Sequence, residues 1–296
     1  MSDNTPPVFR FAPSPNGALH LGHAYSALVN YRLAQEVGGK FLLRIEDIDR
    51  VRCRSELEKD MLEDLEWLGL EWESTPRRQS DHFANYAEAL DTLVCENLIY
   101  PSFMTRGQIR DRVAQLREGG KEWKNDPDGS PLYPGSERDW PIEELEKERI
   151  NSPLHTLRLN MQKALEFACK QIKFHETGSG PQNETGNCTA NPKQWGDLVL
   201  ARSDTPTSYH LSVVIDDALQ GVTHVVRGRD LFHATSVHRL LQELLGLPEP
   251  EYHHHDLILA DDGRKLSKSA GDTSLRALRN AGFTADDVKR LIGFST

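Results

Sequence analysis

Two short segments near opposite ends of the chain constrain its fold more than any other feature. His20-Leu21-Gly22-His23 follows a turn-rich stretch near the N-terminus, and Lys265-Leu266-Ser267-Lys268-Ser269 lies close to the C-terminus. Imidazoles at a helix start and ammonium groups on a loop can both bind phosphate oxygens. We interpret the two segments as halves of one ATP site, which requires a fold that brings them together.

The first segment has the pattern of a strand-turn-helix phosphate site. Residues 8–12 are typical of a strand, prolines and Gly17 follow, and a helical pattern begins near His20. The turn is neither a Gly-x-Gly-x-x-Gly turn nor a P-loop, so we expect Gly22 to let adenine or ribose approach the backbone. His20 and His23 are three residues apart and project toward one face, where they can stabilise charge developing at the α-phosphate.

The second segment contributes lysines. Lys265 and Lys268 follow Gly263 in an Asp-rich stretch, so we expect a loop that binds ATP, with Ser267, and neutralises departing pyrophosphate. Taken alone, a run of Lys and Ser is typical of a solvated surface, and an isolated histidine is typical of a structural residue. The ATP interpretation therefore depends on the pairing of the two segments.

Longer phrases extend this pattern to a family. With HLGH and KLSKS as signatures, the chain resembles the class I aminoacyl-tRNA synthetases. Three phrases are similar to the glutamyl branch: RFAPSP at residues 10–15, LRIEDID at 43–49 and VIDDALQGVTHVVRG at 214–228. The resemblance covers nearly the whole chain and implies a Rossmann-like α/β fold that uses ATP with Mg2+.

Length and one substitution narrow the resemblance. Only 27 residues follow Ser269, whereas a full glutamyl-tRNA synthetase continues into a helical anticodon-binding region, so we expect no such domain here. This is typical of the glutamyl-queuosine tRNA(Asp) synthetase family, which attaches glutamate to queuosine in an anticodon. Glutamyl-tRNA synthetases also carry an Asn four residues after the Tyr that matches Tyr209. This chain has Val213 there, a loss that the queuosine family shares.

A glutamate pocket follows from chemistry and from the resemblance. A bound amino acid needs a cation for each carboxylate and an anion for its ammonium group. Arg10 is placed to bind the side-chain carboxylate, and Glu46 to hold the ammonium group. The resemblance implies that Ser14, Tyr209 and Arg227 also contact glutamate. The alternative is that the arginines and Glu46 pair structurally.

Zinc is where the sequence departs from its apparent relatives, many of which place Cys-x-Cys, a Tyr and a further Cys in the inserted region. The corresponding residues here are Ser102, Met104, Tyr133 and Glu137. Without thiolates these form a poor structural zinc site, so we predict no zinc. We expect packing of Phe103, Met104 and Trp123 to hold the region instead. The run of residues 253–255, three histidines, is no substitute, because neighbours on a strand alternate faces.

Apolar periodicity predicts a mostly parallel α/β sheet interrupted by a polar, irregular insertion. We expect helices near residues 20–37, 54–68, 80–97, 105–118, 160–169 and 230–245, and strands near 8–12, 40–45, 197–202, 211–215, 223–226 and 256–259. The expected organisation is a first half of the catalytic domain at 1–100 and an inserted connective subdomain at 101–195. The second half, at 196–296, carries the KLSKS loop and a short helical tail.

Composition is compatible with a cytoplasmic monomer. The chain has no signal peptide and no long apolar run, and its four cysteines show no paired spacing. A net charge of -10 argues against indiscriminate RNA binding. Two local exceptions exist: residues 101–124 carry six basic and three acidic side chains, and residues 264–296 carry seven and three. Each is either an RNA contact or a solvated helix face.

These features predict an ATP-dependent ligase with two steps. His20, His23 and Lys268 would stabilise phosphate charge while glutamate forms an adenylate, with Gly22, Lys265 and Ser267 holding ATP. Transfer to queuosine of tRNA(Asp) would follow, as the resemblance implies. Two alternatives are kept: a minimal glutamyl-tRNA synthetase that charges a 3′ end, and a non-catalytic RNA-binding paralogue.

Overall fold

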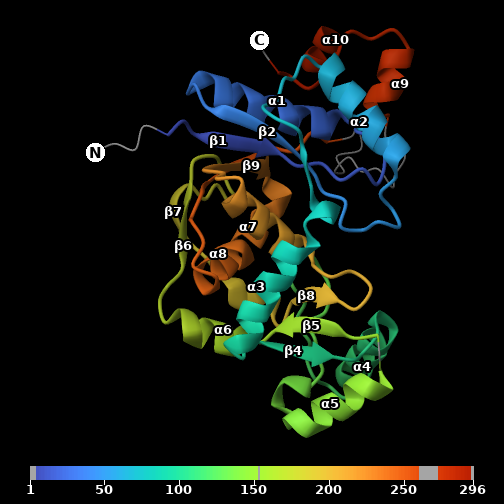
Figure 1. Cartoon of the computed structure of the whole chain (residues 1–296), viewed down its shortest axis with the longest axis vertical. Coiled ribbons are helices and arrows are strands. Elements are labelled where there is room, and N and C mark those ends of the chain that lie inside the picture. Colours follow the sequence, from blue (N-terminus) through green and yellow to red (C-terminus); the bar gives the residue numbers. More distant parts are fainter. Residues whose placement is uncertain (1–4, 153, 260–272, 295–296) are drawn as a thin grey trace.

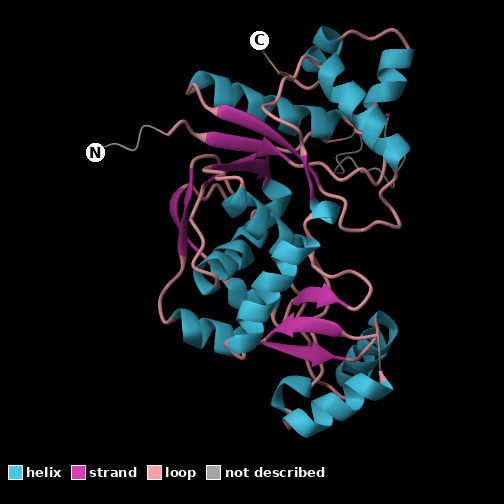
Figure 2. Cartoon of the chain, viewed as in Figure 1, coloured by secondary structure: helices cyan, strands magenta, loops and turns pink. Residues whose placement is uncertain are grey.

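A computed structural model describes residues 5–152, 154–259 and 273–294. Its main element is a seven-stranded sheet with the order β3-β2-β1-β9-β10-β6-β7 (Figures 1 and 2). Neighbouring strands are parallel except β6 and β7. The strands are β1 (Val8–Phe11), β2 (Lys40–Ile45), β3 (Arg77–Arg78), β6 (Lys173–Glu176), β7 (Gly186–Thr189), β9 (His224–Gly228) and β10 (Glu251–His255).

Helices cover both faces of this sheet, as a parallel sheet requires. One face packs on α1 (Leu21–Glu36), α2 (Ser55–Trp67), α9 (Leu275–Asn280) and α10 (Ala285–Leu291). The other packs on α3 (Phe83–Cys95), α6 (Met161–Ala168), α7 (Tyr209–Leu219) and α8 (Ala234–Leu244). Figure 1 shows α1 and α2 on one side and α7 and α8 on the other. Val225 and Val226, neighbours on β9, enter different cores because side chains alternate along a strand.

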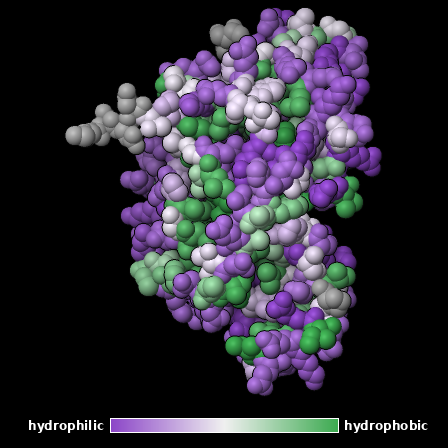
Figure 3. Space-filling view, in the orientation of Figure 1, coloured by the Kyte–Doolittle hydropathy of each residue, from purple (hydrophilic) through white to green (hydrophobic). Residues whose placement is uncertain are grey.

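A smaller antiparallel sheet forms the other end of the molecule. It contains β4 (Ile99–Ser102), β5 (Thr156–Leu159) and β8 (Val199–Arg202), with α4 (Arg106–Glu118) and α5 (Ile142–Asn151) nearby in the chain. Four short 3-10 turns complete the description: η1 (Gln79–Asp81), η2 (Glu137–Asp139), η3 (Pro192–Trp195) and η4 (Arg229–Leu231). Figure 3 shows hydrophobic residues on the surface at this end, where Ile142, Ile150 and Leu154 are exposed.

The expected insertion at 101–195 overlaps the small sheet only in part. β8 lies beyond this range, and β6 and β7 lie within it but pair in the large sheet. Within the described residues, no helix is both long enough and apolar enough to cross a membrane.

The predicted parallel α/β sheet is confirmed, and the six expected helices are present within a few residues. The strand expected at 211–215 is wrong, because these residues lie inside α7. The side chain of Ser208 caps that helix by accepting from the backbone N–H of Leu211, and residues 211–217 are all buried, so no amphipathic stripe marks it. The strand expected at 256–259 is also wrong, because β10 ends at His255.

Candidate active site

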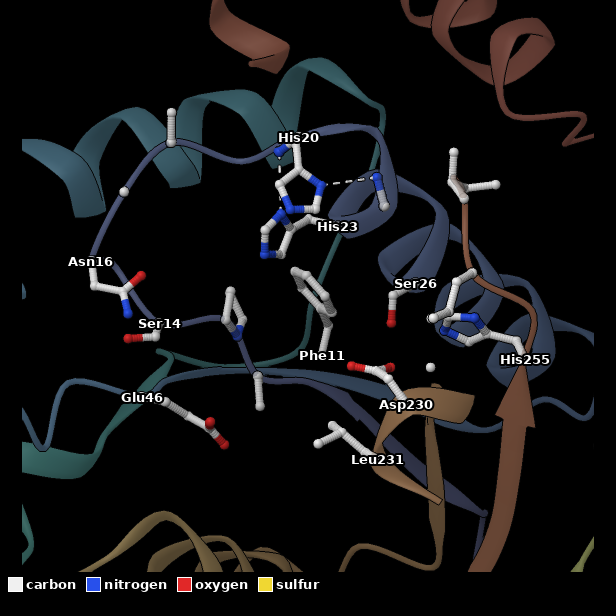
Figure 4. Close-up of a pocket in the computed structure, with 18 of the residues that line it drawn as sticks. Phe11, Ser14, Asn16, His20, His23, Ser26, Glu46, Asp230, Leu231 and His255 are labelled. Carbon is white, nitrogen blue, oxygen red and sulfur yellow. Dashed lines mark hydrogen bonds between the residues drawn. The ribbon is translucent and has the colours of Figure 1, made fainter. Parts of the chain in front are cut away.

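The strand order reverses between β1 and β9, and a cavity of about 910 Å³ opens there, beyond the carboxyl ends of β1, β9 and β10. Ligands bind at such switch points in parallel sheets. Its wall includes Phe11, Ser14, Glu46, Asp230 and His255, and Figure 4 shows these side chains around one space with His20 and His23. Residues from both halves of the chain therefore meet there.

His20 and His23 lie at the N-terminus of α1 with their ring centroids 3.8 Å apart. Nδ1 of His20 accepts from the backbone N–H of Gly22 at 3.1 Å, and Nδ1 of His23 accepts from the backbone N–H of His20 at 3.2 Å. Because both Nδ1 atoms accept, the ring proton of each neutral imidazole lies on Nε2. Two Nε2–H donors at a helix N-terminus suit an anionic phosphate.

A glycine at position 22 is favoured for a structural reason, in addition to the expected close approach of a nucleotide. A Cβ atom at this position would lie 3.1 Å from Cε1 and 3.2 Å from Nδ1 of His20. A larger residue would therefore press on the imidazole that caps α1.

The sequence-predicted glutamate residues come together, but at different depths. Ser14, Glu46 and Tyr209 line the cavity, whereas Arg10 and Arg227 are 6% and 5% exposed and are not among its lining residues.

Arg10 is part of a buried ionic network that the sequence analysis missed. Its Nε donates to Asp217 Oδ1 at 3.0 Å, and Arg44 Nη1 donates to the same oxygen at 2.7 Å. Burial alone would raise the pKa of Asp217, but Arg10 and Arg44 hold it below its usual range. Arg44 and Asp217 both stand in the quoted phrases, so their positions were the available signal.

Glu46 joins this network at its edge. Arg44 Nη2 lies 3.4 Å from Glu46 Oε1. Burial raises the pKa of Glu46 to about 7, with Arg44 and Arg10 partly offsetting the effect. The carboxyl group therefore changes charge near neutral pH, on the wall of the cavity.

Arg227 is held differently. Its Nη2 donates to Thr235 Oγ1 at 2.7 Å, its Nη1 to His238 Nδ1 at 3.0 Å and its Nε to His254 Nε2 at 3.2 Å. Burial lowers the pKa of His254 to about 4, and the pKa of His238 well below its usual value. Both rings are therefore neutral at pH 7.

No carboxylate lies among these acceptors in the described part of the chain. A buried cation without an ion-pair partner is costly unless a ligand brings the missing charge. Arg227 uses three of its five N–H groups for these acceptors, and one proton on each of Nη1 and Nη2 remains for a carboxylate.

A second cavity of about 890 Å³ lies between the large sheet and the small one. Arg52 and Tyr209 line both cavities, so the two adjoin. Of the basic side chains noted at 101–124, Arg106 and Arg110 face the second cavity, where Arg202 joins them. Four aspartates, Asp49, Asp126, Asp128 and Asp197, line the second cavity as well, so side chains of both charges surround the space that adjoins the first site.

Lys265, Ser267 and Lys268 lie outside the described residues. The flanking residues Ile258 and Ser274 line the first cavity, and Leu275 N–H donates to Leu19 O at 2.8 Å. The described chain therefore resumes beside His20, where Ser274 bridges to it, and Ile258, shortly before the gap, lines the same cavity.

The comparisons with known proteins decide the family. Residues 8–292 match the family described as tRNA synthetases class I (E and Q), catalytic domain. The chain belongs to this family. It is accordingly an ATP-dependent ligase of the aminoacyl-tRNA synthetase type, as the sequence predicted.

Individual relatives refine the comparison. The chain is 44% identical over 290 residues to the glutamyl-Q tRNA(Asp) synthetase of Rhodobacter capsulatus, covering 97% of this chain and 99% of the relative. It is 37% identical to that of Symbiobacterium thermophilum, covering 94% and 83%. The glutamate–tRNA ligase of Aquifex aeolicus is 36% identical, with 93% and 54% covered.

A solved structure, the glutamate-tRNA synthetase of Elizabethkingia anophelis, superposes with a TM-score of 0.73 at 28% identity. The match covers 95% of this chain and 54% of that one. The predicted resemblance and the class I synthetase fold are therefore confirmed.

The residues at the zinc positions of this family do not fit zinc. Tyr133 Oη donates to Glu137 Oε1 at 2.5 Å, and Arg158 Nε donates to Ser102 Oγ at 2.9 Å. The guanidinium carbon of Arg158 lies 3.9 Å from the centre of the Tyr133 ring. A cationic side chain thus already lies against these groups, and no thiolate is present to bind a metal.

The expected packing of Phe103, Met104 and Trp123 stays a prediction, and the ring contacts of Phe103 are with other residues. The nearby rings are those of Trp140 and His155, each with its centroid 6.2 Å away, and Trp123 Nε1 donates to Leu132 O at 2.9 Å.

The histidine run does not converge either, because His254 Nδ1 contacts Glu176 and His255 Nδ1 contacts Asp256 O. Among the described residues there is no group of three or more metal-ligating side chains.

Proposed function

We propose that the chain activates L-glutamate with ATP and transfers the glutamyl group to queuosine in tRNA(Asp). One observation carries the activation step: the carboxyl of Glu46 and the α1 imidazoles line one cavity, and the uncompensated cation Arg227 lies on β9, whose last residue, Gly228, lines it too. The names of the most similar relatives support queuosine in tRNA(Asp) as the acceptor.

The glutamate pocket matches the charges of its substrate. Arg227 binds a carboxylate with its two remaining protons, and the ionised form of Glu46 accepts the ammonium group. Arg10 has Nε engaged by Asp217 and Nη1 by Val226 O, so it offers a weaker second contact to the side-chain carboxylate. Ser14 and Tyr209, which line the cavity, orient the ligand.

Activation joins this pocket to ATP. The α-carboxylate attacks the α-phosphorus, the bond to the bridging oxygen breaks, and pyrophosphate leaves with the electron pair. Nε2–H of His20 and His23 stabilise the charge that develops on phosphate oxygens, and Lys265 and Lys268 with Ser267 are assigned to the same phosphates. Mg2+ supplies further charge neutralisation when bound with ATP.

Transfer uses the second cavity. A hydroxyl of the queuosine cyclopentene ring attacks the activated carbonyl, and AMP leaves as the ester forms. Arg52 and Tyr209 line both cavities, so RNA that binds in the second cavity, where Arg106, Arg110 and Arg202 can contact phosphates, reaches the adenylate there. Phosphate contacts of arginines position an RNA without reading its sequence.

The experiment is pyrophosphate exchange with glutamate and ATP, without RNA, followed by transfer of labelled glutamate to tRNA(Asp) with and without queuosine. Exchange and queuosine-dependent labelling are expected. Labelling of the 3′ end of tRNA(Glu) would identify a minimal glutamyl-tRNA synthetase instead. Absence of exchange, even with added tRNA, would favour a non-catalytic paralogue.

A further inference from the structure

The orientation of the Arg227 guanidinium depends on which nitrogen of one histidine ring, that of His254, carries the proton. His254 lies on β10 beside Arg227 and is fully enclosed. Its Nε2 lies 3.2 Å from Nε of Arg227. Arginine has no acceptor, so Nε2 must carry the lone pair, and the ring proton must lie on Nδ1.

Glu176, at the end of β6, selects that tautomer. Its Oε2 lies 2.5 Å from His254 Nδ1, and its Oε1 accepts from the backbone N–H groups of His254 and Gly178, both at 2.8 Å. An ionised carboxylate only accepts, so it holds the proton on Nδ1. Glu176 is 1% exposed and is not part of the cavity wall.

We propose that Glu176 is a positioning residue for glutamate binding, because it fixes the tautomer of His254 and thereby the orientation of the Arg227 guanidinium. The proposal rests on the proposed function, in which Arg227 binds a carboxylate of glutamate. Glu176 touches no substrate and acts through His254 alone.

The substitution Glu176→Gln tests this with nearly no change in shape. The amide oxygen is needed by the two backbone N–H groups, so the amide NH2 faces His254 Nδ1. That ring then carries its proton on Nε2, where it opposes the Nε–H of Arg227. We expect the KM for glutamate to rise about 10-fold, by analogy with the loss of an outer partner of a metal-bound histidine. The KM for ATP and kcat should stay within about twofold of wild type, as for lost ground-state binding.

The variant His254→Leu separates positioning from simple structure, because it removes the ring through which Glu176 is proposed to act. Its KM for glutamate should already be raised. Glu176→Gln should then have almost no further effect in the His254→Leu background. An equal rise in both backgrounds, or a parallel loss of kcat and thermal stability, would overturn the proposal.

Glu251→Gln is the matched control, because Glu251 also pairs with an imidazole, His224 at 3.5 Å, but at the exposed start of β10. It should leave the KM unchanged.

A measurement that does not depend on enzymatic activity distinguishes the positioning role of Glu176 from the proposed function. Nitrogen-15 NMR of the imidazoles should show the proton of His254 on Nδ1 in the wild type and on Nε2 in Glu176→Gln. If the wild type shows no glutamate exchange but the tautomer changes as expected, the proposed function fails and the link from Glu176 to His254 survives. If the tautomer does not change, the positioning proposal fails whatever the activity.

Discussion

Arg10 and Arg227 stand on adjacent strands, β1 and β9, at the same end of the sheet, and are almost equally buried. Arg10 is neutralised by Asp217, which Arg44 shares. Arg227 is held by a hydroxyl and two neutral imidazoles. The difference teaches that burial alone does not identify a binding residue. An arginine with a carboxylate partner builds the scaffold, whereas an arginine with neutral partners keeps its charge for a ligand.

The largest expected effect is on substrate binding by Arg227→Gln. Truncating one partner of a buried charge pair costs about 2–5 kcal/mol, so the KM for glutamate should rise about 100-fold while the KM for ATP changes little. Steady-state pyrophosphate exchange measures both.

Arg239→Gln is the control for this variant, because Arg239 is equally buried but pairs with Glu249 on the far side of α8. It should leave the KM for glutamate unchanged. A similar rise in both variants would mean that the effect comes from general loss of packing.

The free energy of unfolding should change in the reverse order, with a larger loss for Arg10→Gln than for Arg227→Gln. Arg10→Gln leaves Asp217 with Arg44 alone, and breaking a buried pair costs about 3 kcal/mol, so urea unfolding should shift strongly. Arg227→Gln removes a buried cation that has no carboxylate partner and should cost less than about 1 kcal/mol. If Arg227→Gln were the more destabilising variant, the contrast between the two arginines would be wrong.

Glutamate binding should depend on pH through Glu46. Burial raises the pKa of this carboxyl to about 7, and only its ionised form attracts the ammonium group. Protonation as the pH falls therefore weakens binding, and the KM for glutamate should rise about fivefold from pH 7 to pH 6. A pH series of exchange rates tests this. Glu46→Gln should have a raised KM with no such dependence, and a persisting slope would assign the titration to another group.

The smallest effect concerns the small sheet, where Arg158 donates to Ser102 and to Asp197 O and lies over Tyr133. Lysine cannot reproduce this fork and stacking, so Arg158→Lys should lose about 1 kcal/mol of stability. Chemical unfolding measures it, with exposed Arg112→Lys as the neutral control. A chelator should leave the wild-type curve unchanged, and a large chelator effect would show that a metal contributes after all.

Local sequence signals predicted much of the fold and part of the site. α2 can be predicted because one of its faces is apolar. The turn before α1 can be predicted because prolines and a glycine mark the bend. The strand prediction at 211–215 failed because residues 211–217 of α7 are all buried, so no alternation of buried and exposed positions marks the helical period. The phrase containing Glu46 and the segment HLGH led directly to the cavity wall.

The remaining contacts could not be read from the sequence because they join distant residues. Arg44 meets Asp217 across 173 positions, and Glu176 meets His254 across 78. Each of these residue types is common alone, and only the sheet order makes them neighbours. Strand geometry predicted that the three-histidine run would not converge on one ion, but its central residue, His254, has a partner that no local pattern indicates.

The most direct test of the account is calorimetric binding of glutamate and glutamine, at equal concentrations, to the wild type and to Arg227→Gln. The two ligands differ in one charge. We expect the wild type to prefer glutamate strongly and Arg227→Gln to lose both affinity and preference. Unchanged preference for glutamate in Arg227→Gln would contradict the central claim that the uncompensated charge of Arg227 binds the substrate.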